Sequence, residues 1–243
     1  WGMTLVKRVN LEPAFVLHTR AFKETSLLVD LFTKNLGRIN VVAKGARKPK
    51  SPLRSVLTPT SLFAVSFSGK TDLKNLNACE LLNHYSLSMP VSFNSIVYVN
   101  ELLIKATEKE DPHEEIFNQY QLLYEGLSGK KERNEIEVLL RSFELVLLQE
   151  LGYGIDLSFE SISGNKIKPK DKYMFDPSLG FTKVHSDSIK SNGIFLGKDI
   201  LNFSSGDLTE EDSRLASKKI MRLALDHHLG NKSLNIRKYL SKE

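Results

Sequence analysis

Residues 26–43 read SLLVDLFTKNLGRINVVA, and this stretch decides the fold class. An apolar run at residues 26–33 ends at the polar turn Lys34-Asn35. Gly37 follows, and residues 38–43 begin with the apolar–polar alternation of a half-buried strand. Both runs are therefore predicted to be short strands.

Three more runs of the same kind surround this pair. Residues 14–17 are apolar, residues 61–67 alternate clearly, and residues 72–82 indicate a fifth strand. Five short strands separated by turn residues predict a small barrel or sandwich. Three prolines in residues 44–59 argue against a regular strand there.

From residue 92 the apolar spacing becomes helical. We predict helices at residues 94–107, 112–126, 136–151 and 209–229. Residues 155–206 are rich in glycine and proline and contain only short strand-like pieces. The expected fold class is therefore α+β and multidomain. Its predicted segments are a strand-rich domain at 3–82, a helical bundle at 83–154, an irregular strand and loop segment at 155–206, and a C-terminal helix at 207–243 that packs on the helical domain.

Positive charge is concentrated near the N-terminus. Residues 1–80 hold 13 Lys and Arg against 5 Asp and Glu, whereas residues 81–160 hold 6 against 14. No acidic residue lies between Asp30 and Asp72. That interval contains Lys34, Arg38, Lys44, Arg47, Lys48, Lys50, Arg54 and Lys70. A basic stretch without interleaved acids attracts phosphate, although a solvated loop that aids solubility is the alternative.

Aromatic residues are absent from the centre of this basic stretch. None occurs between Phe32 and Phe63. We expect Phe15, Phe32, Phe63 and Phe67 to lie in the barrel core. The stretch should therefore bind backbone phosphate more than bases, with weak sequence preference. If about four cations each displace one counterion, the log–log salt slope on single strands is about −3.

The sequence lacks the usual signatures of catalysis and of metal binding. Cys79 is the single cysteine, which fits a reducing cytosol and a small buried residue better than a nucleophile. No two of the six histidines have the three- or four-residue spacing of helical metal ligands. We expect no catalytic residue, cofactor or metal. We also expect no membrane span and no secretory signal.

Several motifs, in order along the chain, resemble the RecO family of recombination mediators. They are FVLHTR at 15–20, ETSL at 24–27, FT at 32–33, GR at 37–38, VAKGAR at 42–47, RSFEL at 141–145, ELGYG at 150–154 and HLGNKSL at 228–234 with Arg237. The resemblance implies an N-terminal OB-fold, a central helical domain and a C-terminal part packed on it. It also implies a non-enzymatic protein in the cytoplasm, associated with the nucleoid.

The implied activity is binding of single- and double-stranded DNA, annealing of complementary strands, and loading of RecA in the RecF pathway of double-strand-break and gap repair. The implied protein partners are RecR and the C-terminal tail of single-stranded-DNA-binding protein. As DNA-binding residues we predict Arg38, Lys44, Arg47, Lys48, Lys50 and Arg54, with Lys232, Arg237 and Lys238 as a possible extension. For the partner tail, Arg141 and Phe143 are candidates, although a core role for Phe143 is the alternative.

Many members of the family carry a four-cysteine zinc site after the Leu-Gly-Tyr motif. Near the matching positions this chain has Glu160, Ser163, His185 and Ser188. At most two of these residues could bind zinc, so no metal is expected. Phe159, Ile162, Tyr173, Phe175 and Phe181 would then hold the segment together by packing.

Three other functions remain open from the sequence. An OB-fold factor that binds RNA would stack bases on aromatic residues such as Phe15 or Phe63. A nuclease would use clustered carboxylates and magnesium. A scaffold would use the basic loop to bind an acidic protein.

Overall fold

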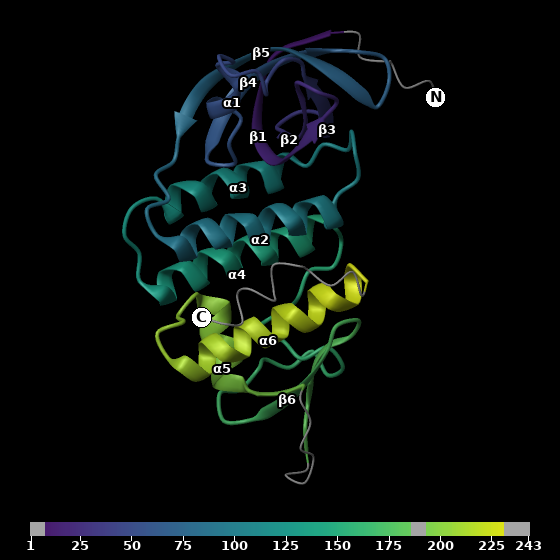
Figure 1. Ribbon diagram of the computed structural model, residues 1–243. Coiled ribbons are helices and arrows are strands. Elements are labelled where there is room, and N and C mark those ends of the chain that lie inside the picture. The colour runs from purple at the N-terminus through teal and green to yellow at the C-terminus, as the bar shows by residue number, and fades with distance from the viewer. Residues whose placement is uncertain (1–7, 186–192, 231–243) are drawn as a thin grey trace. The chain divides into compact units, whose positions relative to one another are not determined.

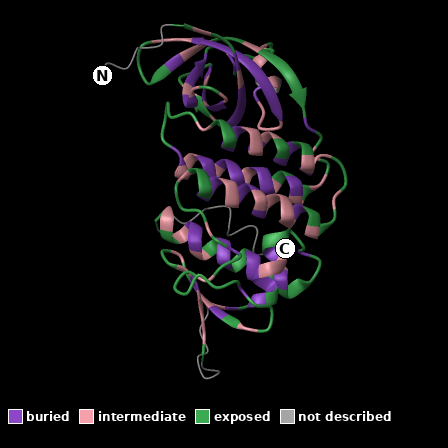
Figure 2. Ribbon diagram, turned by 180° about the vertical axis from the view of Figure 1, so that it is seen from behind, coloured by how far each residue is buried: buried purple, intermediate pink, exposed green. Residues whose placement is uncertain are grey.

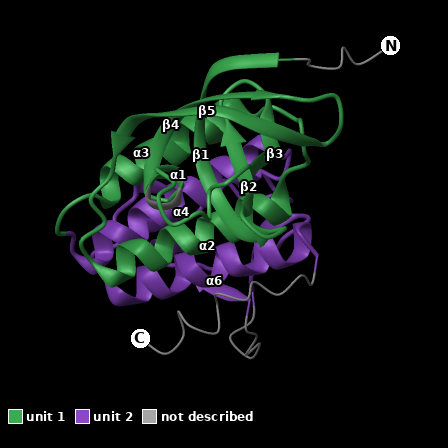
Figure 3. Ribbon diagram, turned by 45° about the horizontal axis from the view of Figure 1, so that its top comes forward, with its two compact units in different colours: residues 1–130, 234–243 green, residues 131–233 purple. Residues whose placement is uncertain are grey.

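The computed structural model describes residues 8–185 and 193–230, except the side chains of Arg54 and Ser55. The chain divides into two compact units (Figure 3). Unit 1 comprises residues 1–130 and 234–243, and unit 2 comprises residues 131–233. The predicted segment boundaries at residues 82, 154 and 206 remain predictions. Across the described part of the chain, no helix is both long enough and apolar enough to span a bilayer.

Unit 1 begins with a closed five-stranded barrel (Figure 1). Its elements are β1 (Arg8–Phe22), β2 (Ser26–Thr33), β3 (Gly37–Ala43), α1 (Leu53–Val56), β4 (Ser61–Ser68) and β5 (Leu73–His84). Around the barrel the order is β1-β2-β3-β5-β4, and β4 pairs with β1 to close it. Every pairing is antiparallel except β3 with β5, where Asn40 lies opposite Leu73. This is the arrangement of an OB-fold, so the predicted fold class is confirmed.

Alternate side chains along the strands point into the barrel and form its core. Figure 2 shows that much of the barrel is buried. Val29, Leu31, Val41, Phe63 and Phe67 are among the inward residues, and each is at most 1% exposed. The proline-rich segment between β3 and β4 forms α1 instead of a strand, as its prolines predicted. Ala46 and Leu57 from that segment also join the barrel core.

Two helices of unit 1 pack against the barrel, and they are α2 (Pro90–Ala106) and α3 (Glu114–Leu127). Phe15 stacks on Tyr124 of α3 at 4.9 Å between ring centroids, and Phe32 contacts Phe117 at 5.6 Å. Phe15 and Phe32 are therefore buried under α3. The expectation that they fill the barrel interior, beside Phe63 and Phe67, was wrong, because β1 and β2 carry a second apolar face.

Unit 2 contains the remaining elements. They are α4 (Arg133–Glu150), β6 (Lys172–Asp176), β7 (Gly180–Lys183), β8 (Ile194–Leu196), α5 (Gly197–Ser205) and α6 (Glu211–His228). The three strands form a small antiparallel sheet in the order β7-β6-β8. Tyr173, Phe175 and Phe181 are buried in it as predicted, whereas Phe159 is 41% and Ile162 is 75% exposed. The expectation that Phe159 and Ile162 help to hold the segment together by packing was wrong, because both side chains are exposed at the surface.

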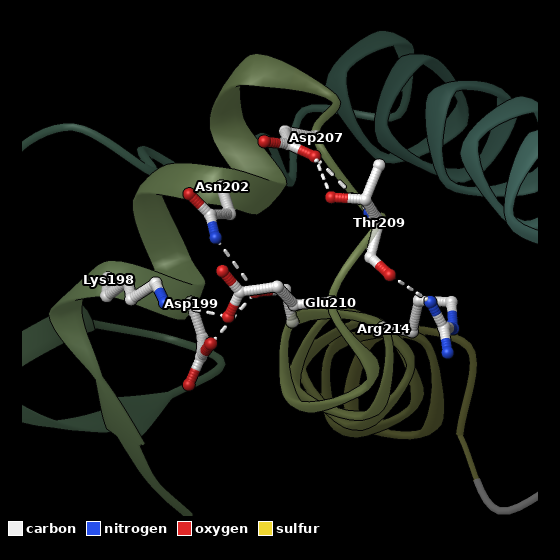
Figure 4. Close-up of polar contacts among 8 residues, drawn as sticks. Lys198, Asp199, Asn202, Asp207, Thr209, Glu210 and Arg214 are labelled. Carbon is white, nitrogen blue, oxygen red and sulfur yellow. Dashed lines mark hydrogen bonds and ion pairs between the residues drawn. The ribbon is translucent and has the colours of Figure 1, made fainter.

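A polar cluster joins α5 to the start of α6 (Figure 4). Ser213 donates a hydrogen bond to Asp199 at 2.8 Å and accepts one from Asn202 at 3.0 Å. Thr209, predicted to open the helix, instead donates its hydroxyl to Asp207 at 2.7 Å. The helix therefore begins two residues later than predicted, at Glu211.

Candidate nucleic-acid interface

The loop that follows β3, residues 44–50, is called the basic loop below. Its backbone makes consecutive turns, in which Lys48 N donates to the Gly45 carbonyl at 3.1 Å. Arg47 N donates to the Thr25 carbonyl in the β1–β2 turn at 2.9 Å, and Ala46 is fully buried in the barrel core. Because both an apolar anchor and a backbone hydrogen bond hold it, the loop has a defined position on the barrel.

The charged side chains of the basic loop point to solvent. Lys44, Arg47, Lys48 and Lys50 are all exposed. Within the described residues, no Asp or Glu oxygen lies at ion-pair distance from these four side chains. Positive potential is therefore not neutralised locally, and the loop can attract an external polyanion.

The end of β1 and the β1–β2 turn add two cations that the sequence analysis did not select. Arg20 and Lys23 are exposed, and Arg47 Nη1 donates to the Lys23 carbonyl at 3.3 Å. Lys23 was overlooked because Glu24 follows it and because both lie before the acid-free interval. The signal that identifies it is topological, since OB-folds bind oligonucleotides with the face of β2 and β3 and with the β1–β2 loop.

Arg38 does not join this surface. Its side chain lies under the α2–α3 connection, where Nη2 donates to the Thr107 carbonyl at 2.6 Å and Nε donates to the Thr107 hydroxyl at 2.9 Å. Burial lowers the pKa of the guanidinium from its ordinary value, and the charges of Asp30 and Glu108 oppose that shift. At 9% exposure Arg38 is unsuited to contact phosphate, so we leave it out of the proposed interface.

Four other residues that were predicted to contact DNA cannot be placed on this surface. The side chain of Arg54 and the residues Lys232, Arg237 and Lys238 lie outside the described residues. Their predicted contact with DNA stays a prediction.

Comparison with known proteins gives the family. The family model "Recombination protein O N terminal" matches residues 8–85, and "Recombination protein O C terminal" matches residues 93–237. A DNA repair protein RecO from Actinobacillus pleuropneumoniae is 38% identical over 231 residues, which cover 94% of this chain and 93% of that protein. The chain belongs to the RecO family. It is therefore a protein of DNA repair and recombination.

Two further RecO relatives align along almost the whole chain. The protein from Nitrosospira multiformis is 38% identical, with 96% of each chain covered. The protein from Aromatoleum aromaticum is 34% identical, with 98% of each chain covered. Both are named DNA repair protein RecO. The barrel with its basic loop thus lies in the N-terminal RecO domain.

The positions where many RecO proteins carry zinc-binding cysteines do not suit a metal in this chain. Glu160 accepts hydrogen bonds from the Ser163 hydroxyl and, at 3.2 Å, from Lys183 N. These bonds hold the pKa of Glu160 below its ordinary value, with the Ser163 hydroxyl as the largest cause. Serine hydroxyls are not the nitrogen and sulfur ligands that zinc prefers. Ser188 lies outside the described residues, and the donor set that is present does not fit zinc.

The predicted partner-tail residues of this RecO chain are buried in unit 2. Phe143 is fully buried, and Arg141 is 8% exposed. Arg141 forms a bidentate ion pair with Glu144, with both N–O distances at 2.7 Å. A cation neutralised by its own helix is a weak attractant for an acidic peptide, so the structure does not favour this site.

Proposed function

We propose that this chain is a non-enzymatic recombination mediator that binds single- and double-stranded DNA and anneals complementary strands. In this proposal it works with RecR to load RecA on DNA coated by single-stranded-DNA-binding protein, whose C-terminal tail it contacts. Membership of the RecO family supports the repair role. The observation that carries the annealing role is the exposed, unneutralised charge of the basic loop.

Annealing follows from simple electrostatics. Two single strands repel each other because both are polyanions. Lys44, Arg47, Lys48 and Lys50 neutralise phosphates without covering base edges, which lowers the repulsion and leaves the bases free to pair.

The RNA-binding alternative predicted stacking of bases on residues such as Phe15 or Phe63. Neither ring can serve, because both are fully buried. The remaining alternatives are separated by experiment. Magnesium-dependent cleavage of DNA would support a nuclease, and failure to bind random oligonucleotides at low salt would support an acidic protein as the ligand.

Charge reversal tests the proposal. We expect Lys44→Glu/Arg47→Glu/Lys48→Glu to weaken DNA binding by roughly tenfold or more and to slow annealing in a fluorescence assay. The wild-type salt slope on single strands should be about −3, and the variant's slope should be clearly shallower, because three of the four cations of the basic loop are lost.

A matched control makes the same charge change elsewhere. Lys166, Lys168 and Lys170 are exposed in unit 2, and their triple reversal should leave annealing and the salt slope unchanged. Equal loss in both variants would mean that total charge, and not the basic loop, drives binding. Both variants should keep the wild-type melting temperature.

A further inference from the structure

Phe22 differs from the other aromatic residues of the barrel. Residues 8–84 contain five, and four of them, Phe15, Phe32, Phe63 and Phe67, are at most 1% exposed. Phe22 is partly exposed, at the end of β1. An apolar ring held at the surface, beside the charged residues that bind phosphate, is the arrangement with which proteins stack unpaired bases.

The register of the strands places Phe22 beside the basic loop. Phe22 pairs with Ser26 of β2, and the next residue of β2, Leu27, pairs with Ala43 at the end of β3. Lys44, the first residue of the basic loop, follows directly. Phe22 is thus two strands away from Lys44, a separation of about 10 Å.

Phe22 also lies on the outer face of the barrel. Leu27 and Val29 of β2 pack inward, so the alternate residues of β2, and the β1 residues paired with them, face outward. Arg20 pairs with Leu28 and therefore shares this face with Phe22, about 7 Å along β1. An exposed cation flanks the ring on its own strand.

A second cation lies over the ring itself. Lys23 Nζ is 5.5 Å from the centroid of Phe22, and the backbone of Lys23 is tied to Arg47. The ammonium group sits on a flexible four-carbon stem, so it can leave the ring for a phosphate. A base can then take its place on the ring, while the charge moves to the backbone of the same nucleotide.

We propose that Phe22 is a stacking site for one unpaired nucleobase and that it makes this DNA-binding surface prefer single strands. The inference rests on the proposed function, because the basic loop must first hold the sugar–phosphate chain. A duplex keeps its bases stacked inside and offers no free face to Phe22. The ring therefore contributes to single-strand binding alone, whereas Lys44, Arg47 and Lys48 contribute to both.

Two substitutions at this position test the inference. Phe22→Leu keeps an apolar side chain and removes the aromatic face. We expect it to weaken binding of oligothymidylate by roughly tenfold and to leave binding of a duplex of equal length unchanged. Phe22→Trp keeps a larger aromatic face, and its binding of oligothymidylate should equal or exceed that of the wild type.

The tryptophan of the Phe22→Trp variant also reports base stacking directly, through its fluorescence. Emission of the Phe22→Trp protein should be quenched by oligothymidylate and not by duplex, measured against the wild-type protein, whose tryptophan is Trp1. As a control, Phe93→Leu removes an aromatic side chain that is 41% exposed on α2 and should change neither affinity.

The outcomes separate this inference from the proposed function. A wild-type protein that binds neither form of DNA would overturn both. Wild-type binding to both forms, with Phe22→Leu equal to wild type or weakened equally on single strands and duplex, would overturn the stacking site alone. Thermal unfolding at the wild-type temperature shows that Phe22→Leu is folded.

Discussion

At the scale of single residues, identical charges in the same stretch have different surroundings. Arg38 and Arg47 are both basic residues in the acid-free interval, and nothing nearby in the sequence separates them. The buried Arg38 donates hydrogen bonds to Thr107, which is 69 residues away. Exposure of the basic loop could be predicted from its prolines and charges, whereas burial of Arg38 depends on a contact between distant segments.

The neighbouring Gly37 allows the α2–α3 connection to lie close to the start of β3. Its φ is +70°, and a Cβ there would overlap the backbone carbonyl of Asp111. We expect Gly37→Ala to lower the stability of unit 1 by about 2 kcal/mol or more, since it adds a steric clash to the left-handed backbone cost. Gly129 has a φ of +80°, and a Cβ there would meet no atom within 4 Å, so Gly129→Ala should show the backbone cost alone. Equal melting temperatures for the two variants would contradict this assignment.

At the scale of elements, regular patterns were predicted and irregular ones were not. The strands β2 to β5 and the helices α2, α3, α4 and α6 correspond to predicted runs, within a few residues at their ends. β1 was predicted only in its centre, at residues 14–17, and is much longer, from Arg8 to Phe22. The nine-residue helix α5 was missed because it lies in a segment rich in glycine. The parallel pairing of β3 with β5 was also missed, because alternation shows which residues face inward but not which strands are neighbours.

The hydrogen bonds of Glu160 predict acid sensitivity of the small sheet in unit 2. Its pKa is lowered in the folded protein, so its stabilising effect is present above the unfolded value of about 4.3 and is lost as pH falls through the folded pKa. Glu160→Gln should therefore lower the melting temperature at pH 7 and have a smaller effect at pH 3. Ser163→Ala removes the main donor and should show the same pattern. A constant difference between wild type and Glu160→Gln at both pH values would contradict the prediction.

At the scale of the whole molecule, the family domains and the compact units end at different places. The N-terminal family model ends at residue 85, whereas unit 1 continues through α2 and α3 to residue 130. The contacts that cross residue 85 include the stacking of Phe15 on Tyr124 and the ion pair of Lys74 with Glu110. The sequence predicted a barrel followed by helices, but alternation alone could not reveal that β1 and β2 need α3 as a cover.

Because α3 covers β1 and β2, the barrel cannot be shortened to the N-terminal family domain without exposing apolar side chains. A truncated protein of residues 3–85 would expose Phe15 and Phe32 to water as an apolar surface. We expect this protein to aggregate or to increase the fluorescence of a hydrophobic dye. A protein of residues 3–130 keeps α3 over this apolar surface, and it should unfold cooperatively without binding the dye. If the shorter product were as soluble and as cooperative as the longer one, the barrel would be a free-standing module that could be grafted onto other proteins.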